Sequence, residues 1–244
     1  MAVTFPVILL TRPLDAATRF AQEIAQTLNE VKVVVSPILQ IEYAGELPGG
    51  AFVGVIFTSA YGVEGYLRTG GDISCPCWCV GEATAKAAIK AGMQAKSAGG
   101  DADALVRQIV EHGVQGPLLH VRGAHVRGDV AARLTKAGCT TREAVVYDQV
   151  VQVLSEEAKV VLNCGKPVIV PLFSPRSARE FARQHMGSAP IYVAAMSQAV
   201  AEALGGLQYA QIMVAERPDA AAMLIAVQGL FDAAGQLEGQ PGAQ

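Results

Sequence analysis

The stretch Val168-Ile-Val-Pro-Leu-Phe-Ser-Pro-Arg-Ser-Ala178 shows most clearly how this chain is built. Its apolar first half is typical of a buried strand, and the chain then turns at Ser174 into a helix. The same arrangement occurs earlier, in Val53-Gly-Val-Ile-Phe-Thr-Ser-Ala-Tyr-Gly-Val63. Such a turn places a hydroxyl group and backbone N–H groups at the carboxyl end of a strand, where open α/β sheets bind ligands. Two such turns in one chain indicate an internal repeat.

The composition indicates a folded chain rather than a disordered one. A length of 244 residues is enough for one large or two small domains with a hydrophobic core. Of these residues, 51% are hydrophobic and 17% are charged, as in folded proteins. The net charge of −3 and the absence of a basic run argue against a nucleic-acid partner. No apolar run is long enough to span a bilayer, and the first residues, which reach Arg12, lack the basic start of a signal peptide. We therefore expect a cytoplasmic protein with no membrane partner.

The cysteines favour the same compartment and a packing role. There are five, an odd number, and Cys75, Cys77 and Cys79 alternate so that they would share one face of a strand. Thiolates can bind zinc, but this spacing differs from the usual C-x₂-C, and no second pair or nearby histidine follows. We therefore expect core packing and no metal.

Apolar runs and helical patterns alternate along the whole chain. In residues 14–29, Phe20, Ile24 and Leu28 are spaced by four and predict one face of a helix. Strands that alternate with helices are the signature of parallel α/β sheets, and nearly continuous apolar runs indicate strands covered on both faces. The expected strands are residues 6–11, 31–36, 53–58, 77–80, 93–97, 117–122, 140–147, 168–173, 191–195 and 212–215, with residues 37–43 and 150–153 also extended.

The two halves of the chain match segment by segment. The matching segments are Leu9-Leu-Thr-Arg12 with His120-Val-Arg122, Ile56-Phe-Thr-Ser59 with Pro171-Leu-Phe-Ser174, and Val80-Gly-Glu-Ala-Thr-Ala85 with Met196-Ser-Gln-Ala-Val-Ala201. The repeat predicts two sheets of about five strands each. Either each half is its own domain, or the chain crosses over twice, at residues 37–43 and 144–152. In both cases a cleft between two domains is the default ligand site.

Several short motifs follow one another in a definite order. They are Leu10-Thr-Arg-Pro13, Phe57-Thr-Ser59 with Gly62-Val63, Val80-Gly-Glu-Ala-Thr-Ala85, Leu119-His-Val-Arg-Gly123, Val145-Val-Tyr147 and Phe173-Ser-Pro-Arg-Ser-Ala178. In this order and spacing they resemble the uroporphyrinogen-III synthase family, from Ile8 to about Gly229. The chain departs from the family at Tyr61, where a small or amide residue is common, and at Val200, where a second threonine is common.

The resemblance implies two similar α/β domains, each an open parallel sheet flanked by helices, with the active site in the cleft between them. The first domain would be discontinuous, with residues 1–36 and 153–244. The second would be inserted into it, with residues 43–144. Residues 37–42 and 145–152 would form a two-stranded linker, which favours the interleaved alternative.

The resemblance also implies a reaction. The family closes the linear tetrapyrrole hydroxymethylbilane into uroporphyrinogen III, with loss of water and inversion of ring D, in tetrapyrrole (heme) biosynthesis. It is a hydro-lyase that uses no metal or organic cofactor, and we expect a monomer. One alternative is a non-catalytic tetrapyrrole-binding or sensor protein on the same scaffold. A periplasmic-type binding protein has the same two-lobed plan but is disfavoured without an export signal.

The family's substrate carries eight carboxylates, yet this chain is net acidic, so a basic cluster alone is not expected to bind it. Helix N-termini offer N–H groups and partial positive charge, each contributing roughly 0.3–1 kcal/mol toward an exposed anion. The strand-to-helix turns supply such ends, although their serines have the alternative role of simple N-caps. The residues expected to bind substrate at these turns are Ser59, Gly81, Thr84, Ser174 and Ser197.

Arginines are expected to bind carboxylates as well. Arg12 and Arg122 lie at matching strand ends, where a guanidinium can hold a carboxylate with two hydrogen bonds. Arg176 lies in the first turn of a helix, where its charge opposes the helix dipole, and this placement favours contact with an anion. The alternatives are surface ion pairs for Arg12 and Arg122 and a solvated side chain for Arg176.

Tyr147 is the expected catalytic residue. Ring closure requires the hydroxyl group of the substrate to leave as water, and a phenol can protonate or orient that group. An unperturbed pKa of roughly 10 keeps the side chain protonated at neutral pH. The alternative is a tyrosine that only packs against the linker strands. The motifs of hydrolases, dehydrogenases and NTPases are missing from the sequence.

Overall fold

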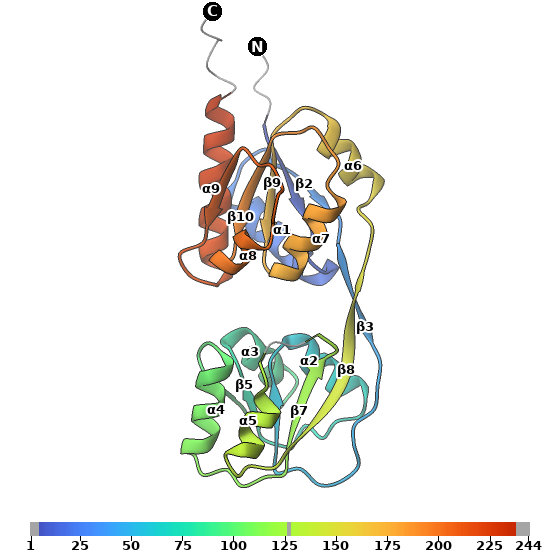
Figure 1. The fold of residues 1–244 in the computed structure, drawn as a ribbon, viewed down its shortest axis with the longest axis vertical. Helices are drawn as coiled ribbons and strands as arrows, with labels where there is room; N and C mark the ends of the chain where they lie inside the picture. The colour runs from blue at the N-terminus through green and yellow to red at the C-terminus, as the bar shows by residue number, and fades with distance from the viewer. Residues whose placement is uncertain (1–4, 126–127, 238–244) are drawn as a thin grey trace, which may run out of the picture. The chain divides into compact units, whose positions relative to one another are not determined.

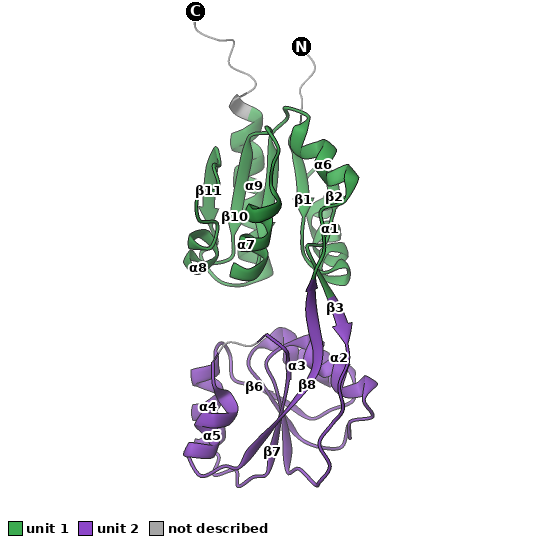
Figure 2. Ribbon diagram, turned by 45° about the vertical axis from the view of Figure 1, so that its right-hand side comes forward, with its two compact units in different colours: residues 1–40, 151–244 green, residues 41–150 purple. Residues whose placement is uncertain are grey.

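The computed structural model describes residues 5–125 and 128–237 and divides the chain into two compact units. Unit 1 contains residues 1–40 and 151–244, and unit 2 contains residues 41–150 (Figure 2). The chain passes between the units within β3 (Leu39–Tyr43) and again within β8 (Thr141–Val151). Both passages fall in the segments 37–42 and 145–152 that the sequence analysis assigns to a linker.

Unit 1 is built on a five-stranded parallel sheet (Figure 1). Its strands are β1 (Val7–Leu10), β2 (Lys32–Val35), β9 (Val168–Leu172), β10 (Ile191–Ala195) and β11 (Gln211–Val214). Their order is β11-β10-β9-β1-β2, and Val7 of β1 pairs with Lys32 on one side and with Val168 on the other. The sheet therefore needs both ends of the chain.

Helices cover both faces of this sheet, as the continuous apolar strands predict (Figure 1). The helices are α1 (Leu14–Thr27), α6 (Glu156–Asn163), α7 (Pro175–Gln184), α8 (Gln198–Glu202) and α9 (Ala220–Leu237). Ile8 points to one face and packs with Phe20 of α1 and with α9. Leu9 points to the other face, where Phe181 of α7 packs with α6 and α8. Burial of each such side chain contributes roughly 1.5–3 kcal/mol.

Unit 2 is built on a six-stranded sheet. Its further strands are β4 (Gly54–Phe57), β5 (Cys77–Cys79), β6 (Ala95–Ser97) and β7 (Leu118–Gly123). The order is β3-β8-β7-β4-β5-β6, and the strands from β8 to β6 are parallel to one another. The sequence predicts about five strands here. The additional one is β3, whose residues were expected to be extended and join this sheet as an edge strand.

The two faces of the second sheet carry separate cores. The helices of unit 2 are α2 (Ala60–Arg68), α3 (Glu82–Lys90), α4 (Ala102–Glu111) and α5 (Val130–Lys136). α2 and α3 cover one face, where Cys75, Cys77 and Cys79 lie together in the core, as their alternation predicts. α4 and α5 cover the other face, which contains Ile56 and Trp78.

A few observed boundaries differ from the predicted ones. The helix predicted over residues 126–137 begins at Val130, and residues 126 and 127 lie outside the described residues. The extended segments 140–147 and 150–153 were predicted separately, but residues 141–151 form the single strand β8. The last helix continues past its predicted end at Ala233, because Ala234 still packs into the core. Most of the predicted tail, residues 238–244, lies outside the described residues.

Candidate active site

Parallel strands of unit 2 end at one edge of its sheet, and Ser59 lies at the end of β4. It is the N-cap of α2, and its Oγ accepts a hydrogen bond from the backbone N–H of Tyr61 at 3.2 Å. This cap satisfies one N–H group of the first helical turn. Because a hydroxyl both accepts and donates, the proton of Ser59 is still available for a second partner.

The phenol of Tyr147 lies near this hydroxyl group. Tyr147 lies on β8, its side chain is only 7% exposed, and Ser59 is close enough to lower the pKa of the phenol. The ring of Tyr61 lies beside it, with 5.9 Å between the ring centroids and 55° between the ring planes. Two residues that the sequence analysis selected separately, Ser59 and Tyr147, therefore meet in the folded unit.

The protonation state of Tyr147 follows from this environment. Burial raises the pKa of the phenol above its usual value, and the nearby side chain of Ser59 opposes part of that rise. The phenol is therefore neutral at physiological pH and carries the proton that a donor needs.

Gly123 makes room for the phenol at the end of β7. A bulge follows Arg122, so Gly123 pairs with Tyr147 instead of with Val146. A Cβ atom at Gly123 would lie 2.6 Å from Cζ of Tyr147 and 3.0 Å from its hydroxyl oxygen. The backbone N–H of Ala124 also donates to the carbonyl oxygen of Tyr147 at 2.9 Å. The position of the ring therefore depends on glycine at residue 123.

The start of α3 lies after the neighbouring strand, β5. Gly81 is its N-cap, and a Cβ atom there would meet no other atom within 4 Å. Thr84 is 7% exposed, and its backbone N–H donates to the carbonyl oxygen of Gly81 at 3.1 Å. The first turn of this helix thus begins without a side chain in front of it, an arrangement that allows an anion to approach the backbone.

Arg122 already holds a carboxylate within the protein. Its Nε and Nη2 atoms each lie 3.0 Å from an oxygen of Glu143, and its Nη1 donates to the carbonyl oxygen of Gly123 at 3.0 Å. Glu143 also lies 3.3 Å from Nδ1 of His120, a histidine that is only 1% exposed. Of the two roles considered for Arg122, the structure therefore contains the ion pair within the protein, in which Nη2 donates to Glu143 while Nε makes no hydrogen bond within the described residues.

In unit 1, Ser174 occupies the position that corresponds to Ser59. It is the N-cap of α7, and its Oγ accepts a hydrogen bond from the backbone N–H of Ser177 at 3.1 Å. The two serine hydroxyls are 2.6 Å apart. Arg176 lies half-buried in the same first turn. The N-cap role considered for Ser174 is thus present, and it leaves Ser174 at the carboxyl end of β9.

Arg12 follows β1 at the same edge of this sheet. Its guanidinium carbon lies 3.7 Å from the ring centroid of Phe173, the residue that precedes Ser174. Phe173 in turn meets Phe20 edge to face, with 5.0 Å between the centroids. Stacking on a ring in this way restricts the orientations open to a planar guanidinium.

Ser197 follows β10 and precedes the short helix α8. Unlike Ser59 and Ser174, its side chain makes no capping hydrogen bond in the described structure. Unit 1 thus has Arg12, Ser174 and Ser197 after neighbouring parallel strands, β1, β9 and β10.

The sequence of the chain matches one protein family over most of its length. The family described as uroporphyrinogen-III synthase HemD matches residues 20–225, which is most of the chain. The chain belongs to the uroporphyrinogen-III synthase family. Members of this family are hydro-lyases of tetrapyrrole biosynthesis. Among curated proteins, no sequence matches the chain.

Solved structures of uroporphyrinogen-III synthases share the fold. The enzyme from Helicobacter pylori superposes with a TM-score of 0.65 at 17% identity, and the match covers 92% of this chain and 99% of that one. A mutant enzyme from Thermus thermophilus superposes with a TM-score of 0.54 at 15% identity, covering 95% and 99% of the two chains. The α/β fold predicted from the sequence is therefore confirmed.

Two residues that lie against Tyr147 were not predicted from the sequence. Tyr61 was noticed only as a departure from the family pattern, and its ring lies beside Tyr147. Gly123 belongs to a quoted motif, but its contact with Tyr147 depends on the bulge between β7 and β8. A pairing irregularity of this kind leaves no local signal in the sequence.

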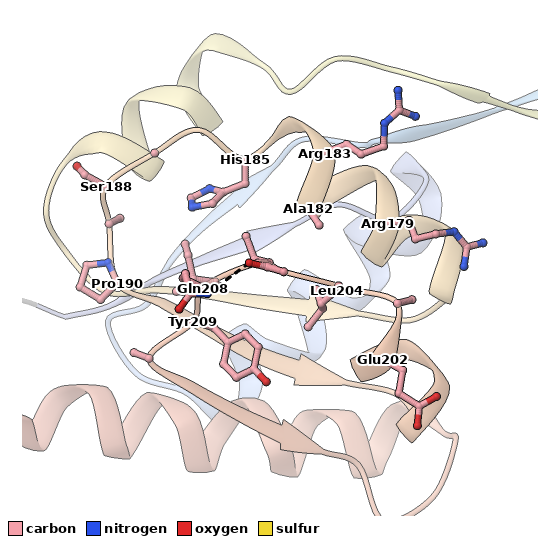
Figure 3. Close-up of a pocket in the computed structure, with 18 residues that line it drawn as sticks. Arg179, Ala182, Arg183, His185, Ser188, Pro190, Glu202, Leu204, Gln208 and Tyr209 are labelled. Carbon is pink, nitrogen blue, oxygen red and sulfur yellow. Dashed lines mark hydrogen bonds between the residues drawn. The ribbon is translucent and has the colours of Figure 1, made fainter.

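A groove in unit 1 lies elsewhere (Figure 3). It has a volume of about 1070 Å³ and lies between the C-terminal parts of α7 and α8 and the segments before β10 and β11. His185 and Tyr209 line it, while the guanidinium groups of Arg179 and Arg183 extend outward (Figure 3). None of the predicted site residues of this synthase lines it. We therefore assign no step of the reaction to this groove.

Two further features of the synthase concern metals and membranes. Within residues 5–125 and 128–237, no group of three or more histidine, cysteine or acidic side chains is arranged to hold a metal ion. In the same residues, no helix has the length and apolar character needed to span a bilayer.

Proposed function

We propose that the chain converts hydroxymethylbilane into uroporphyrinogen III and that Tyr147 supplies or orients the proton for the leaving hydroxyl group. The observation that carries this proposal is the position of Tyr147, which is buried near Ser59 and beside the ring of Tyr61, at the carboxyl edge of a parallel sheet in a member of the synthase family. The neutral phenol suits the role, because a hydrogen-bond donor must hold its proton at working pH.

The proposed reaction begins when the pyrrole nitrogen lone pair expels the hydroxyl group, which takes up a proton and leaves as water. The cation left on the methylene carbon is attacked by the substituted carbon of ring D, and a carbon–carbon bond forms. Migration of the bond between ring D and its other methylene carbon inverts the ring, and loss of one proton completes the product. The net change is the loss of water, and the proton returned at the end restores the acid.

Binding of the substrate is assigned to the carboxyl edges of both sheets. Backbone N–H groups at the helices that start near Ser59, Gly81 and Ser174 would donate hydrogen bonds to the carboxylates of the substrate. Thr84, Arg176 and Ser197 belong to the same turns. Arg12 would add a charged contact, because stacking on Phe173 orders its side chain before the substrate arrives. Arg122 would contribute only by sharing its guanidinium with Glu143.

We propose the following domain organisation for the chain. Residues 1–36 with 153–244 and residues 43–144 would act as two substrate-binding domains linked by residues 37–42 and 145–152. The protein would work as a cytoplasmic monomer without a cofactor and without a nucleic-acid partner. The net charge of −3 supports the last point.

The decisive experiment is an isomer analysis. The purified protein is mixed with freshly made hydroxymethylbilane, and uroporphyrinogens I and III are resolved after oxidation to the porphyrins. Isomer III in excess over a protein-free control supports the proposal. Isomer I alone contradicts it, and tight binding of uroporphyrinogen III without its formation would favour the tetrapyrrole-binding alternative.

A further inference from the structure

Tyr61 occupies a defined position beside the proposed acid. It is in the first turn of α2, and its backbone N–H is held by Oγ of Ser59 at 3.2 Å. The same serine lies near the phenol of Tyr147, so the start of α2 brings the two tyrosines together. Their rings lie 5.9 Å apart at 55°, within the range of favourable aromatic pairs.

The packing of α2 makes this position rigid. Gly62 lies so close to β7 that a Cβ atom there would be 3.2 Å from the carbonyl oxygen of Val121. Tyr61 itself packs against the core of unit 2 and is partly buried, whereas Tyr147 is buried. Tyr61 is therefore the more accessible of the two tyrosines.

The proposed reaction forms a cationic intermediate, which an aromatic ring can stabilise. Loss of the hydroxyl group leaves a cation on the substrate, and a nearby carboxylate of the protein could trap that cation by forming an ester. The negative face of an aromatic ring attracts a cation without supplying a nucleophilic atom. It also excludes water, which would otherwise return the cation to the starting alcohol.

We propose that the ring of Tyr61 contacts the substrate and, together with Tyr147, stabilises its cationic intermediate by a cation–π interaction. This inference rests on the proposed function and assigns a role to a residue at which the chain departs from its family pattern. Tyr61 would thus influence turnover more than substrate affinity, because the cation exists only after the substrate is bound.

The first test compares Tyr61→Leu with Tyr61→Phe. Loss of the ring should lower kcat about fivefold to thirtyfold with less than a twofold change in KM, as expected for loss of a cation–π contact. Tyr61→Phe keeps the ring and should retain most of the turnover. Tyr209→Leu removes an exposed tyrosine, in unit 1, and serves as the control with wild-type kinetics. Equal losses in the Phe and Leu variants, or a loss confined to KM, would overturn the inference.

The second test keeps the shape of the side chain constant. Phenylalanines carrying no, one, two or three fluorine atoms are placed at residue 61, so that the ring face becomes progressively less negative. The logarithm of kcat should fall steadily along the series, and a flat series overturns the inference even if Tyr61→Leu does not fold. If wild type makes isomer III and the series is flat, only this inference fails. If wild type makes isomer I alone, the proposed function fails and this inference with it.

Discussion

The hydroxyl group of Ser59 connects the first turn of α2 with Tyr147 on β8. Its Oγ accepts a hydrogen bond from the backbone N–H of Tyr61 at 3.2 Å, and its proximity lowers the pKa of the Tyr147 phenol. A helix cap and a buried tyrosine thus depend on one atom. A substitution at either residue can therefore affect both the stability of the fold and the reaction of the substrate.

Tyr147→Phe should lower kcat by at least about tenfold while the protein remains folded, because the variant lacks the proton donor. Ser59→Ala should lower kcat less, and the double variant should be no worse than Tyr147→Phe, since Ser59 acts through the phenol. Steady-state kinetics of the four proteins provide the measurement. The control is Tyr66→Phe, which removes a buried hydroxyl that donates to the carbonyl oxygen of Asp72 at 3.2 Å. An unchanged kcat in Tyr147→Phe would remove Tyr147 from the mechanism.

Gly123→Ala should reduce turnover because its new methyl group would displace the ring of Tyr147. Gly81→Ala meets nothing within 4 Å, so its melting temperature should match that of wild type while KM rises, because the methyl group covers the start of α3. Gly100→Ala also meets nothing within 4 Å and is the control. Thermal melts and kinetics of the three variants test this. Wild-type kinetics in Gly81→Ala would argue against a substrate at α3.

Ser174→Ala and Ser155→Ala form a matched pair of cap removals in unit 1. Each serine accepts a backbone N–H bond, Ser174 at 3.1 Å and Ser155 at 3.2 Å. Each change should cost about 1 kcal/mol and lower the melting temperature by about 2–4 °C. Only Ser174→Ala should also raise KM, because Ser155 caps α6, a helix outside the proposed site. Identical kinetics in the two variants would leave Ser174 as a structural cap alone.

The buried His120 should make stability depend on mild acid. Burial lowers the pKa of His120 below its usual value, although Glu143 opposes the shift, and the nearby Arg122 lowers it further. Above about pH 6.5 the histidine is neutral in both states, so its contribution is constant. As pH falls below that value, the unfolded chain binds the proton more readily than the folded one, and stability is lost.

Urea unfolding of wild type should therefore show a free energy of unfolding that changes little between pH 7.5 and 6.5 and falls by roughly 1 kcal/mol between pH 6.5 and 5.5 for one histidine. His120→Gln should flatten this slope. Burial lowers the pKa of His185 as well, so His185→Gln should flatten it in the same direction. Equal slopes in wild type and His120→Gln would show that His120 does not control the acid response.

Most of the fold was predictable because its signals are local. The apolar run before Ser174 and the one before Ser59 predict strands, and both serines cap helices as expected. The family resemblance implied that residues 37–42 pair with residues 145–152, but the repeat pattern alone did not predict that β3 is an edge strand of the second sheet. Sequence patterns indicate that a segment is extended, but they do not specify its neighbour.

The sequence indicated candidate site residues, but it did not indicate which residues they contact in the folded protein. Arg122 was selected as a carboxylate binder, and it holds the carboxylate of Glu143, which lies on the neighbouring strand β8. Whether an arginine binds a carboxylate of the substrate or one of the protein depends on strand register. The residue type alone does not indicate that register. Tyr147 and Ser59 were selected separately, because their proximity depends on the order β8-β7-β4 in the sheet.

The order of β1 between β9 and β2 has a consequence for synthesis on the ribosome. β1 and β2 emerge early, but β9, the strand that pairs with β1, emerges only after all of residues 41–150 have been translated. Unit 2 has its own strands and cores by then and can complete its fold first. During that interval Ile8 and Leu10 lack their partner strand, so the nascent N-terminal segment is where a chaperone would be needed most.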